Sequence, residues 1–398
     1  MKKILIVSSS LDTGGAQKMI SNITTALPDG WEADILLNTA KNIQFAYRGN
    51  IISLDIPEPK SRTSLWYQTK VLIKRLFKLY QLKKQNNYQA CISLLDSANV
   101  ANIITGKKYC KVVITAVVNM SESAYIKAYR YVVFPLIRIF YNHASVIVAQ
   151  NSAIRDDLIE HFGIRKELFS IIYNGINSDS IEKIAELKLA EEERTWFDKN
   201  NTIISAGRLT YAKGQWHLIR AFSEVVKQKP DAKLVIFGQG ELKEYLQELI
   251  QAYHLENNAC IRGFDSELDK YIANSAVFAF PSMIEGMPTV LLEAMTCKTM
   301  CIVTDFKSGA REIMDYPAEG SITHTTEANY GIITPICSGK YWKAQDPLEE
   351  NEKILAAAMT KALQDEAYRK TYEERGKERS RYFDMKNLIW QWLAVAER

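Results

Sequence analysis

Residues 277–295 read "VFAFPSMIEGMPTVLLEAM". Four apolar residues, typical of a buried strand, lead into a short loop rich in Pro and Gly and then into an apolar, helix-forming run. Pro288 suits the first position of that helix, because its fixed φ and missing N–H cost nothing there. One carboxylate, Glu285, lies in the loop and a second, Glu293, lies inside the expected helix. We interpret the stretch as strand, loop and helix at the carboxyl edge of a parallel sheet.

The spacing of these two carboxylates favours one class of ligand. The N–H groups and partial positive charge of the helix N-terminus would meet an anion. A carboxylate close to a phosphate is costly unless it accepts hydrogen bonds from hydroxyl groups, and a sugar nucleotide has hydroxyls on both sides of its diphosphate. Other Glu pairs with the same spacing lie in charged surface stretches or a polar loop, where solvation accounts for them.

The same alternation of short β-branched runs and longer amphipathic stretches continues along the chain. It is seen in "KILIVSS", "GAQKMISNITTAL" and "ADILLNT", and it restarts later with "TIISAGRL" and "KLVIFGQG". This pattern predicts parallel βαβ units with helices on both faces of each sheet. Because 398 residues exceed what one core usually holds, we expect two doubly wound α/β domains facing a central cleft. Their expected ranges are 1–180 and 201–375, with a linker at 181–200 and a C-terminal helix at 376–398.

Composition excludes several other classes. The six Cys include no C-x-x-C and the five His are scattered, so neither a zinc site nor a disulfide framework is expected. The apolar run of "MKKILIVSSS" is too short for a signal peptide, and no stretch is long and apolar enough to span a membrane. We therefore expect reduced thiols and a cytoplasmic location.

Positive charge gathers in the first half, where residues 1–180 hold 22 Lys and Arg against 13 Asp and Glu. Within it, Leu65–Gln85 has apolar residues at helical spacing, and basic residues fill the other face: Lys70, Lys74, Arg75, Lys78, Lys83 and Lys84. Such a helix can lie in an anionic lipid interface. A core-facing helix with a solvated basic face fits the pattern equally well. Nucleic acid is not expected, because the aromatic residues do not interleave with the basic ones.

Cationic partners for a diphosphate follow another expected strand. In "SAGRLTYAKG", Arg208 and Lys213 can both reach a diphosphate at the domain edge. No D-x-D occurs anywhere in the chain, so no metal is expected to neutralise phosphate charge. Nearer the start, Gly14 and Gly15 precede a helix and permit close approach of a ligand to the backbone. The G-x-G-x-x-G and P-loop patterns are absent, which weakens the dehydrogenase and NTPase hypotheses.

Together these motifs resemble the retaining glycosyltransferases of family 4, which have the GT-B fold. The matching runs are "GGAQ", "YNGI", "AGRL", "FGQGEL", "IRGF", "PSMIEGMPTVLLEAM" and "SGAREI". The resemblance implies a C-terminal helix that packs back on the N-terminal, acceptor-binding domain, which would cover Trp390 and Trp392. It also implies that the C-terminal domain binds the nucleotide sugar.

The resemblance also implies a role for each motif residue. Arg208 and Lys213 would bind the donor diphosphate and stabilise the leaving nucleotide. Glu285 would lie near the transferred sugar and the reacting centre, and Glu293 would hold the ribose. The remaining donor contacts would come from Gly14, Gly15, Gly263, Phe264, Gly286, Met287, Pro288 and Thr289.

One expected residue is missing. Many relatives carry a His in the first domain where this chain has Val118 and Asn119, so Asn119 becomes the catalytic candidate, with Ser121 and Glu122 as nearby polar substitutes.

The resemblance implies metal-independent, retaining transfer of a hexose or N-acetylhexosamine from a UDP-linked or other nucleotide-diphosphate donor. The acceptor would be a glycan or a lipid-linked glycan in bacterial surface polysaccharide synthesis, including lipopolysaccharide or capsule, at the inner face of the membrane. No cofactor is expected. Two alternatives stay open, a nucleotide-sugar epimerase on the same fold and a non-catalytic protein that binds nucleotide sugars or glycans.

Overall fold

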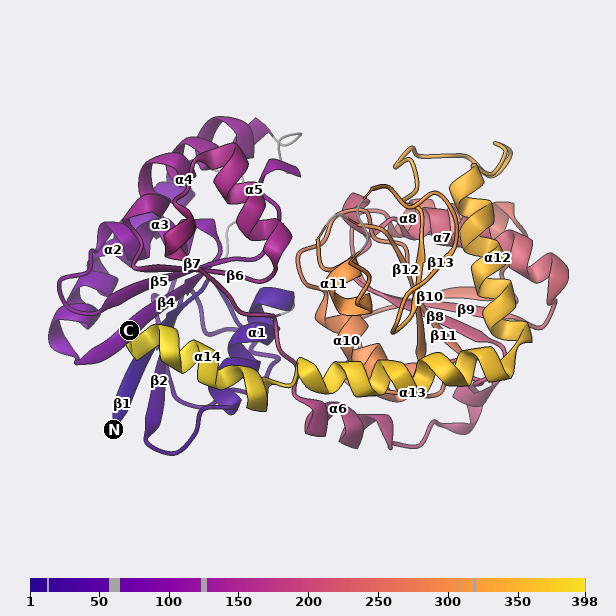
Figure 1. The fold of residues 1–398 in the computed structure, drawn as a ribbon, viewed down its shortest axis with the longest axis horizontal. Coiled ribbons are helices and arrows are strands. Elements are labelled where there is room, and N and C mark those ends of the chain that lie inside the picture. The colour runs from indigo at the N-terminus through magenta and orange to yellow at the C-terminus, as the bar shows by residue number, and fades with distance from the viewer. Residues whose placement is uncertain (13, 57–64, 123–126, 307, 318–319, 398) are drawn as a thin grey trace. The chain divides into compact units, whose positions relative to one another are not determined.

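The chain forms two compact units in a computed structural model (Figure 1). The structure describes residues 1–398 except 13, 57–64, 123–126, 307, 318–319 and 398. The first unit comprises residues 1–176 and 385–398, and the second comprises residues 177–384. Each unit is built around its own seven-stranded sheet, so the expected pair of doubly wound α/β folds is confirmed.

The sheet of the first unit is parallel throughout and has the order β3-β2-β1-β4-β5-β6-β7. Its strands are β1 (Lys2–Val7), β2 (Trp31–Leu37), β3 (Asn50–Ser53), β4 (Tyr88–Leu94), β5 (Lys111–Ala116), β6 (Val146–Ala149) and β7 (Phe169–Ile171). Its helices are α1 (Gly15–Thr25), α2 (Leu65–Gln85), α3 (Asp96–Ile104), α4 (Phe134–Phe140), α5 (Ser152–Phe162) and α14 (Met385–Glu397), and a π-helical turn spans Tyr129–Val133.

Helices cover both faces of this sheet. Figure 1 shows α2, α3, α4 and α5 on one face and α1 with α14 on the other. That division follows from right-handed crossovers, because the chain moves one way from β1 to β3 and the other way from β4 to β7. The central strands are buried on both faces, which explains why they read as unbroken apolar runs.

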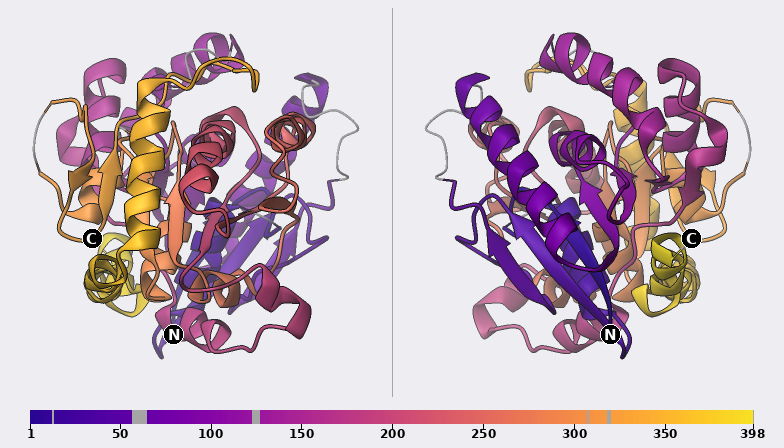
Figure 2. Two further views of the ribbon diagram at one scale, coloured as in Figure 1. Left: turned by 90° about the vertical axis from the view of Figure 1, so that its right-hand side faces the viewer. Right: turned by 90° about the vertical axis from the view of Figure 1, so that its left-hand side faces the viewer.

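The second unit repeats this plan with the order β10-β9-β8-β11-β12-β14-β13, in which only the β13–β14 pair is antiparallel. Its strands are β8 (Thr202–Ala206), β9 (Lys233–Phe237), β10 (Ala259–Arg262), β11 (Val277–Phe280), β12 (Met300–Thr304), β13 (Thr326–Glu327) and β14 (Ile332–Thr334). Its helices are α6 (Ser178–Ala185), α7 (Gln215–Gln228), α8 (Lys243–Ala252), α9 (Leu268–Ala273), α10 (Thr289–Thr296), α11 (Ala310–Met314), α12 (Glu350–Gln364) and α13 (Glu366–Tyr382). Within this unit α12 packs along α7 (Figure 2, left).

The expected linker at 181–200 is in fact part of the second unit. It contains the end of α6 and a 3₁₀ turn, Glu191–Thr195. Phe197 is buried, and its ring centroid lies 4.8 Å from that of Tyr271. The hydroxyl of Tyr271 donates to Glu193 over 2.6 Å. These contacts attach the segment to α9 of the second unit, and the boundary between the units falls at residues 176 and 177.

The expected C-terminal helix at 376–398 is divided between the units. It breaks after Tyr382, so that α13 belongs to the second unit and α14 to the first. Trp392 is buried in the core of the first unit, whereas Trp390 is 60% exposed. The prediction that both would be covered is therefore wrong for Trp390, because residues two apart point to nearly opposite sides of a helix.

Helix α2 is not amphipathic in the expected sense. Arg75 and Lys83, expected on a solvated face, are buried, and each is 1% exposed. The apolar side chains of Ile73 and Phe77 are instead 61% and 66% exposed. The ammonium of Lys83 donates to the Asn102 carbonyl over 2.9 Å, near the C-terminal end of α3, where a cation is favoured.

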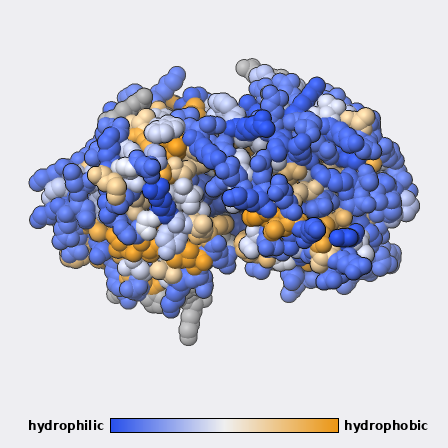
Figure 3. Space-filling model, turned by 90° about the horizontal axis from the view of Figure 1, so that it is seen from below, coloured by the Kyte–Doolittle hydropathy of each residue, from blue (hydrophilic) through white to orange (hydrophobic). Residues whose placement is uncertain are grey.

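The visible surface of both units is mostly hydrophilic, with scattered apolar groups (Figure 3). Among the described helices, none has the length and apolarity that crossing a bilayer requires. All six cysteines are free thiols.

Candidate functional site

The predicted donor residues Arg208 and Glu285 of the second unit lie at one edge of its sheet. The order of this sheet reverses between β8 and β11, and ligands of doubly wound sheets bind at the carboxyl ends of strands beside such a reversal. Arg208 follows β8, and Glu285 lies in the loop after β11. Because these strands are parallel neighbours, both residues lie at the same edge.

The turn that carries Lys213 is bound to the loop that carries Glu285. The backbone N–H groups of Met283 and Ile284 both donate to the carbonyl of Ala212, over 2.8 and 3.2 Å. Gly214 then starts α7 with a φ of 62°, and a Cβ there would lie 2.4 Å from the Pro281 carbonyl oxygen. Only glycine fits this close, left-handed position, so Gly214 keeps the two segments together.

Lys213 and Glu285 form an ion pair through Nζ and Oε1. Their side chains are only 17% and 10% exposed. The ammonium also lies 5.4 Å from the centroid of the Phe280 ring, and Ser308 donates its hydroxyl proton to the Glu285 carbonyl oxygen. An anion placed here would compete with Glu285 for Lys213.

Arg208 is positioned differently. Its backbone is fixed, because its carbonyl accepts from Gln215 Nε2 over 3.1 Å and from the N–H of Thr210 over 2.9 Å. Its side chain is exposed. Arg208 can therefore reach an anion without first leaving a buried partner.

The residues that follow Glu285 lead into α10. Pro288 is the N-cap, so the helix begins at Thr289, one residue later than expected. Met287, Thr289 and Glu293 are 4%, 8% and 4% exposed. Gly286 is also buried. The donor contacts and the ribose-binding role expected for these residues stay predictions.

Gly263 and Phe264 follow β10, two strands away from β8 at the same edge. Phe264 is 49% exposed, so its ring is open to solvent. A contact between this pair and a nucleotide base stays a prediction.

The predicted residues of the first unit lie at loops after β1 and β5. Gly14 is the N-cap of α1 with a φ of 133°, and a Cβ on Gly15 would meet nothing within 4 Å. Asn119 is 5% exposed, and its Oδ1 has no hydrogen-bond partner among the described residues. Ser121 is engaged with Asp157, through its backbone N–H over 3.2 Å and through its hydroxyl.

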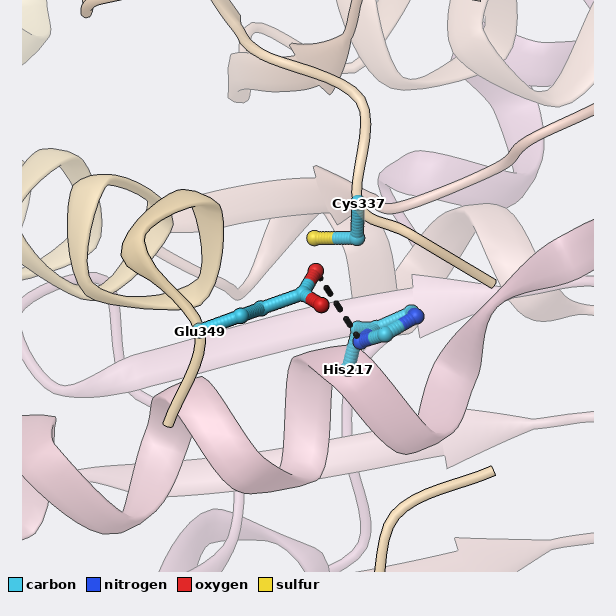
Figure 4. Close-up of side chains that lie close together, drawn as sticks. All are labelled: His217, Cys337 and Glu349. Carbon is cyan, nitrogen blue, oxygen red and sulfur yellow. Dashed lines mark ion pairs between the residues drawn. The ribbon is translucent and has the colours of Figure 1, made fainter. Parts of the chain in front are cut away.

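A largely buried polar cluster of His217, Cys337 and Glu349 was not expected from the sequence (Figure 4). The backbone N–H of Gly339 donates to His217 Nε2 over 3.3 Å, so the proton of this ring lies on Nδ1, which is 2.7 Å from Glu352 Oε1. Burial, with the nearby Glu349 and Glu352 carboxylates, raises the pKa of the Cys337 thiol. No local motif signals this cluster, because His217 is 120 residues from Cys337 and still farther from Glu349 in sequence.

Hydrogen bonds from His217 and from neighbouring residues of α7 hold the segment 336–349 against this helix. The Arg220 guanidinium donates to Glu352 over 2.8 Å and to the carbonyl of Lys343 over 2.6 Å. The Trp216 indole N–H donates to the Lys340 carbonyl over 2.8 Å. Because α7 begins at Gln215, two residues after Lys213, these contacts also support the turn that carries Lys213. Each of the three labelled residues is already engaged within the protein, and the expectation of no metal stays a prediction.

Comparison with known proteins shows the family of the chain. The model described as "Glycosyltransferase Family 4" matches residues 13–180, and the model described as "Glycosyl transferases group 1" matches residues 188–329. An uncharacterized glycosyltransferase of Methanocaldococcus jannaschii is 32% identical over 351 residues, covering 85% of this chain and 86% of that protein.

Two further relatives extend the comparison. A Campylobacter jejuni N-acetylgalactosaminyltransferase, whose name gives an undecaprenol-diphosphate-linked substrate, is 31% identical over 63% of this chain and 59% of its own length. The crystal structure of Anabaena HepE with UDP and glucose has a TM-score of 0.74, at 20% identity and 99% coverage of both chains, which shows the fold. The chain therefore belongs to the group 1 and family 4 glycosyltransferases of the GT-B fold.

Proposed function

We propose that this glycosyltransferase moves a hexose or N-acetylhexosamine from a UDP-linked donor to a glycan or lipid-linked acceptor, with retention of anomeric configuration. The observation that carries the proposal is the largely buried Lys213–Glu285 pair near the exposed Arg208, at the reversal in the order of the second sheet. This arrangement offers two cations for a diphosphate and one carboxylate for sugar hydroxyls.

The proposed transfer begins with competition between Glu285 and the donor diphosphate for Lys213. When the diphosphate arrives, Lys213 turns from Glu285 to the phosphate, and Arg208 adds a second charge-assisted contact. Glu285, freed from its partner, accepts a hydrogen bond from a hydroxyl of the transferred sugar. As the bond from the anomeric carbon to the diphosphate oxygen breaks, both cations stabilise the charge on the leaving nucleotide.

In the proposed route to retention, the acceptor hydroxyl attacks from the face that the nucleotide leaves. Its proton then passes to the departing diphosphate oxygen, so no protein base is needed for the transfer. The chain has Val118 and Asn119 where many relatives have a His, which supports this route. The buried amide of Asn119 is suited to orient a hydroxyl, but not to take a proton.

Relatives support the choice of donor and acceptor. HepE was crystallised with UDP and glucose, and the name of the Campylobacter jejuni relative specifies a diphospho-undecaprenol-linked substrate. A lipid-linked acceptor would keep the enzyme at the inner face of the cytoplasmic membrane.

The outer side of α2 supports that location. Ile73 and Phe77 are exposed there, and Lys70 and Lys74 on the same helix are exposed as well. Apolar side chains beside lysines fit an anionic lipid interface, where the apolar side chains enter the acyl boundary and the ammonium groups meet headgroups. We define Lys70, Ile73, Lys74 and Phe77 as the α2 outer surface and propose that it contacts anionic lipid.

The test of the proposal is a transfer assay. The purified chain is incubated with a panel of UDP- and GDP-linked sugars and a polyprenyl-diphosphate-linked acceptor, and NMR gives the anomeric configuration of the product. We expect a UDP sugar to give an α-linked product from an α-linked donor. Inverted product, epimerised donor without transfer, or donor binding without turnover across the panel would contradict the proposal.

A further inference from the structure

The first unit contains a second polar site at the reversal in its own strand order. That order reverses between β1 and β4, with β2 on the other side of β1. Arg75 reaches this edge from α2, and its side chain is 1% exposed. Its Nη2 donates to Asn38 Oδ1 and its Nη1 to Ser97 Oγ, both over 2.9 Å. Asn38 follows β2 and Ser97 follows β4, so the guanidinium spans the carboxyl end of β1 between them.

The Arg75 charge is not neutralised by the described residues. Both of its acceptors are uncharged, no described carboxylate pairs with it, and its Nε has no hydrogen-bond partner in the described part of the chain. Burial lowers the pKa of this guanidinium to about 10. A buried charge without a partner is strongly unfavourable.

Lys83, the other buried cation of α2, is an example of a buried charge whose hydrogen-bond donors are all satisfied by the protein itself. Its ammonium has three N–H donors and three oxygen acceptors: the Asn102 carbonyl, the Thr105 hydroxyl and the Gly106 carbonyl. Arg75 has five N–H donors and only two described acceptors. A neutral amide side chain could donate hydrogen bonds to Asn38 and Ser97 equally well. A structural link between these two residues therefore does not explain why the side chain at position 75 carries a charge.

Neighbouring groups at this edge also suit an anion. Ser8, directly after β1, has a buried hydroxyl with no partner among the described residues, and the adjacent Ser9 carbonyl accepts from the N–H of Asn38 over 3.0 Å. Helix α3 begins at Asp96, so its positive end lies at the same edge. Leu95, which precedes it, has a φ of 74°, a strained value for a bulky residue and one typical of functional sites.

We propose that Arg75, with the Ser8 hydroxyl and the N-terminus of α3, binds a phosphate or diphosphate group. This inference rests on the proposed function, because a phosphorylated acceptor would bring that group to the acceptor-binding domain. The phosphate can come from a lipid-linked acceptor or from a small phosphorylated one. A guanidinium provides paired N–H donors for phosphate oxygens, which Lys does not.

The test uses the full chain with UDP at saturation, so that the donor site is occupied, and inorganic pyrophosphate as the calorimetric probe. We expect Arg75→Met to weaken pyrophosphate binding about tenfold or more, the usual effect of losing a charge-assisted contact. Lys84→Met removes the same charge from an exposed position of α2 and should change the affinity less than about twofold. UDP affinity should be unchanged in both variants.

Further arms separate the sources of phosphate and guard against misfolding. A short-chain prenyl diphosphate that binds more tightly than pyrophosphate would indicate a lipid-linked acceptor, and equal affinities would indicate a small one. If Arg75→Met does not fold, Ser8→Ala tests the site instead, and we expect it to lower the affinity for pyrophosphate about threefold or more. Wild-type protein that does not bind pyrophosphate, or variants that bind it as well as wild type, would overturn the site. Binding through Arg75 without sugar transfer would instead keep the site and contradict the proposed function.

Discussion

Lys213 and Glu285 show how a carboxylate can lie beside the proposed diphosphate site. In the described structure the ammonium neutralises the carboxylate, and both side chains are largely buried. Removing one partner of a buried pair leaves an uncompensated charge. We expect substitutions of the two residues to have different effects on UDP binding, although the residues form an ion pair.

Lys213→Ala should lower kcat roughly 100- to 1000-fold, because it removes a donor to the leaving diphosphate. Glu285→Gln should also lower kcat, but UDP should bind the variant at least as tightly, because Lys213 no longer has a competing carboxylate. Steady-state kinetics and UDP titration calorimetry check both. Lys227→Ala on α7 is the control, since that side chain is 67% exposed. Weaker UDP binding by Glu285→Gln would contradict the competition between carboxylate and phosphate.

Asp96 provides a prediction of pH dependence. Burial raises the pKa of this carboxyl from 3.8 to about 6, although the Tyr141 hydroxyl donates to it over 3.1 Å. Between these values the folded state binds more protons than the unfolded state. The free energy of unfolding therefore falls as pH rises from about 4 to about 6, by on the order of 3 kcal/mol.

Asp96→Asn removes this titration and keeps an oxygen acceptor for Tyr141. We expect the variant to be more stable than wild type at pH 8, by up to about 3 kcal/mol, and the difference to shrink toward pH 4. Urea unfolding at pH 4, 6 and 8 measures it. The exposed Asp29→Asn is the control. A difference that does not vary with pH would show that the Asp96 carboxyl does not titrate in this range.

Among the elements, helix α2 has one side that packs into the first unit and another that is exposed to solvent. Its inner side carries Val71, Arg75, Leu79 and Leu82 into the unit, and the α2 outer surface faces solvent. Charge reversal at Arg75 would therefore disturb the interior and could not test membrane contact. The exposed lysines can test it.

Lys70→Gln with Lys74→Gln should weaken binding to anionic vesicles about tenfold or more, because each lysine near such a surface contributes roughly 1 kcal/mol. Co-sedimentation at physiological ionic strength measures the change. The matched control is Lys353→Gln with Lys370→Gln, two exposed lysines of the second unit. If both double variants lost the same vesicle affinity, the effect would come from net charge alone and not from the α2 outer surface.

The turn before α7 gives a second prediction at this scale. Gly214→Ala forces a Cβ against the Pro281 carbonyl, whereas Gly163, with a similar φ of 68°, has nothing within 4 Å of that position. Gly163→Ala should cost about 1 kcal/mol from backbone strain alone. Gly214→Ala should cost more and should also weaken UDP binding, since it separates the Lys213 turn from the Glu285 loop. Chemical denaturation and calorimetry compare the two, and equal effects would argue against that coupling.

At the scale of the whole molecule, the chain leaves the first unit at residue 176 and returns to it at residue 385. The returning helix α14 adds Trp392, Leu388 and Ile389 to the first core. The first unit is thus completed by the last residues of the chain.

Trp392→Ala should destabilise the first unit by about 3–5 kcal/mol, the usual cost of emptying a buried aromatic site. Trp390→Ala, on the exposed side of the same helix, should change stability by less than about 0.5 kcal/mol. Calorimetric unfolding of both variants makes the comparison. Similar melting temperatures would mean that α14 contributes little to this core.

The sequence alone determined the elements with strong local patterns. Parallel strands buried on both faces are continuous apolar runs, so β1, β2, β4, β5, β6 and the strands β8 to β12 could be predicted. The motif around Glu285 indicated a strand, a loop and a helix for the same reason. The short strands β3, β7, β13 and β14 were missed, because each contains at most two apolar residues and so lacks such a run.

Only the tertiary structure decided which side chains meet. Lys213 and Glu285 are 72 residues apart, and Arg75 joins Asn38 to Ser97 across three segments of the chain. Periodicity placed Arg75 on a solvated face, because it cannot reveal which side of a helix the sheet and loops will cover. Local sequence dictates an element through steric and solvation preferences of neighbouring residues, whereas a buried charge acquires its environment from strands and helices that are remote in sequence.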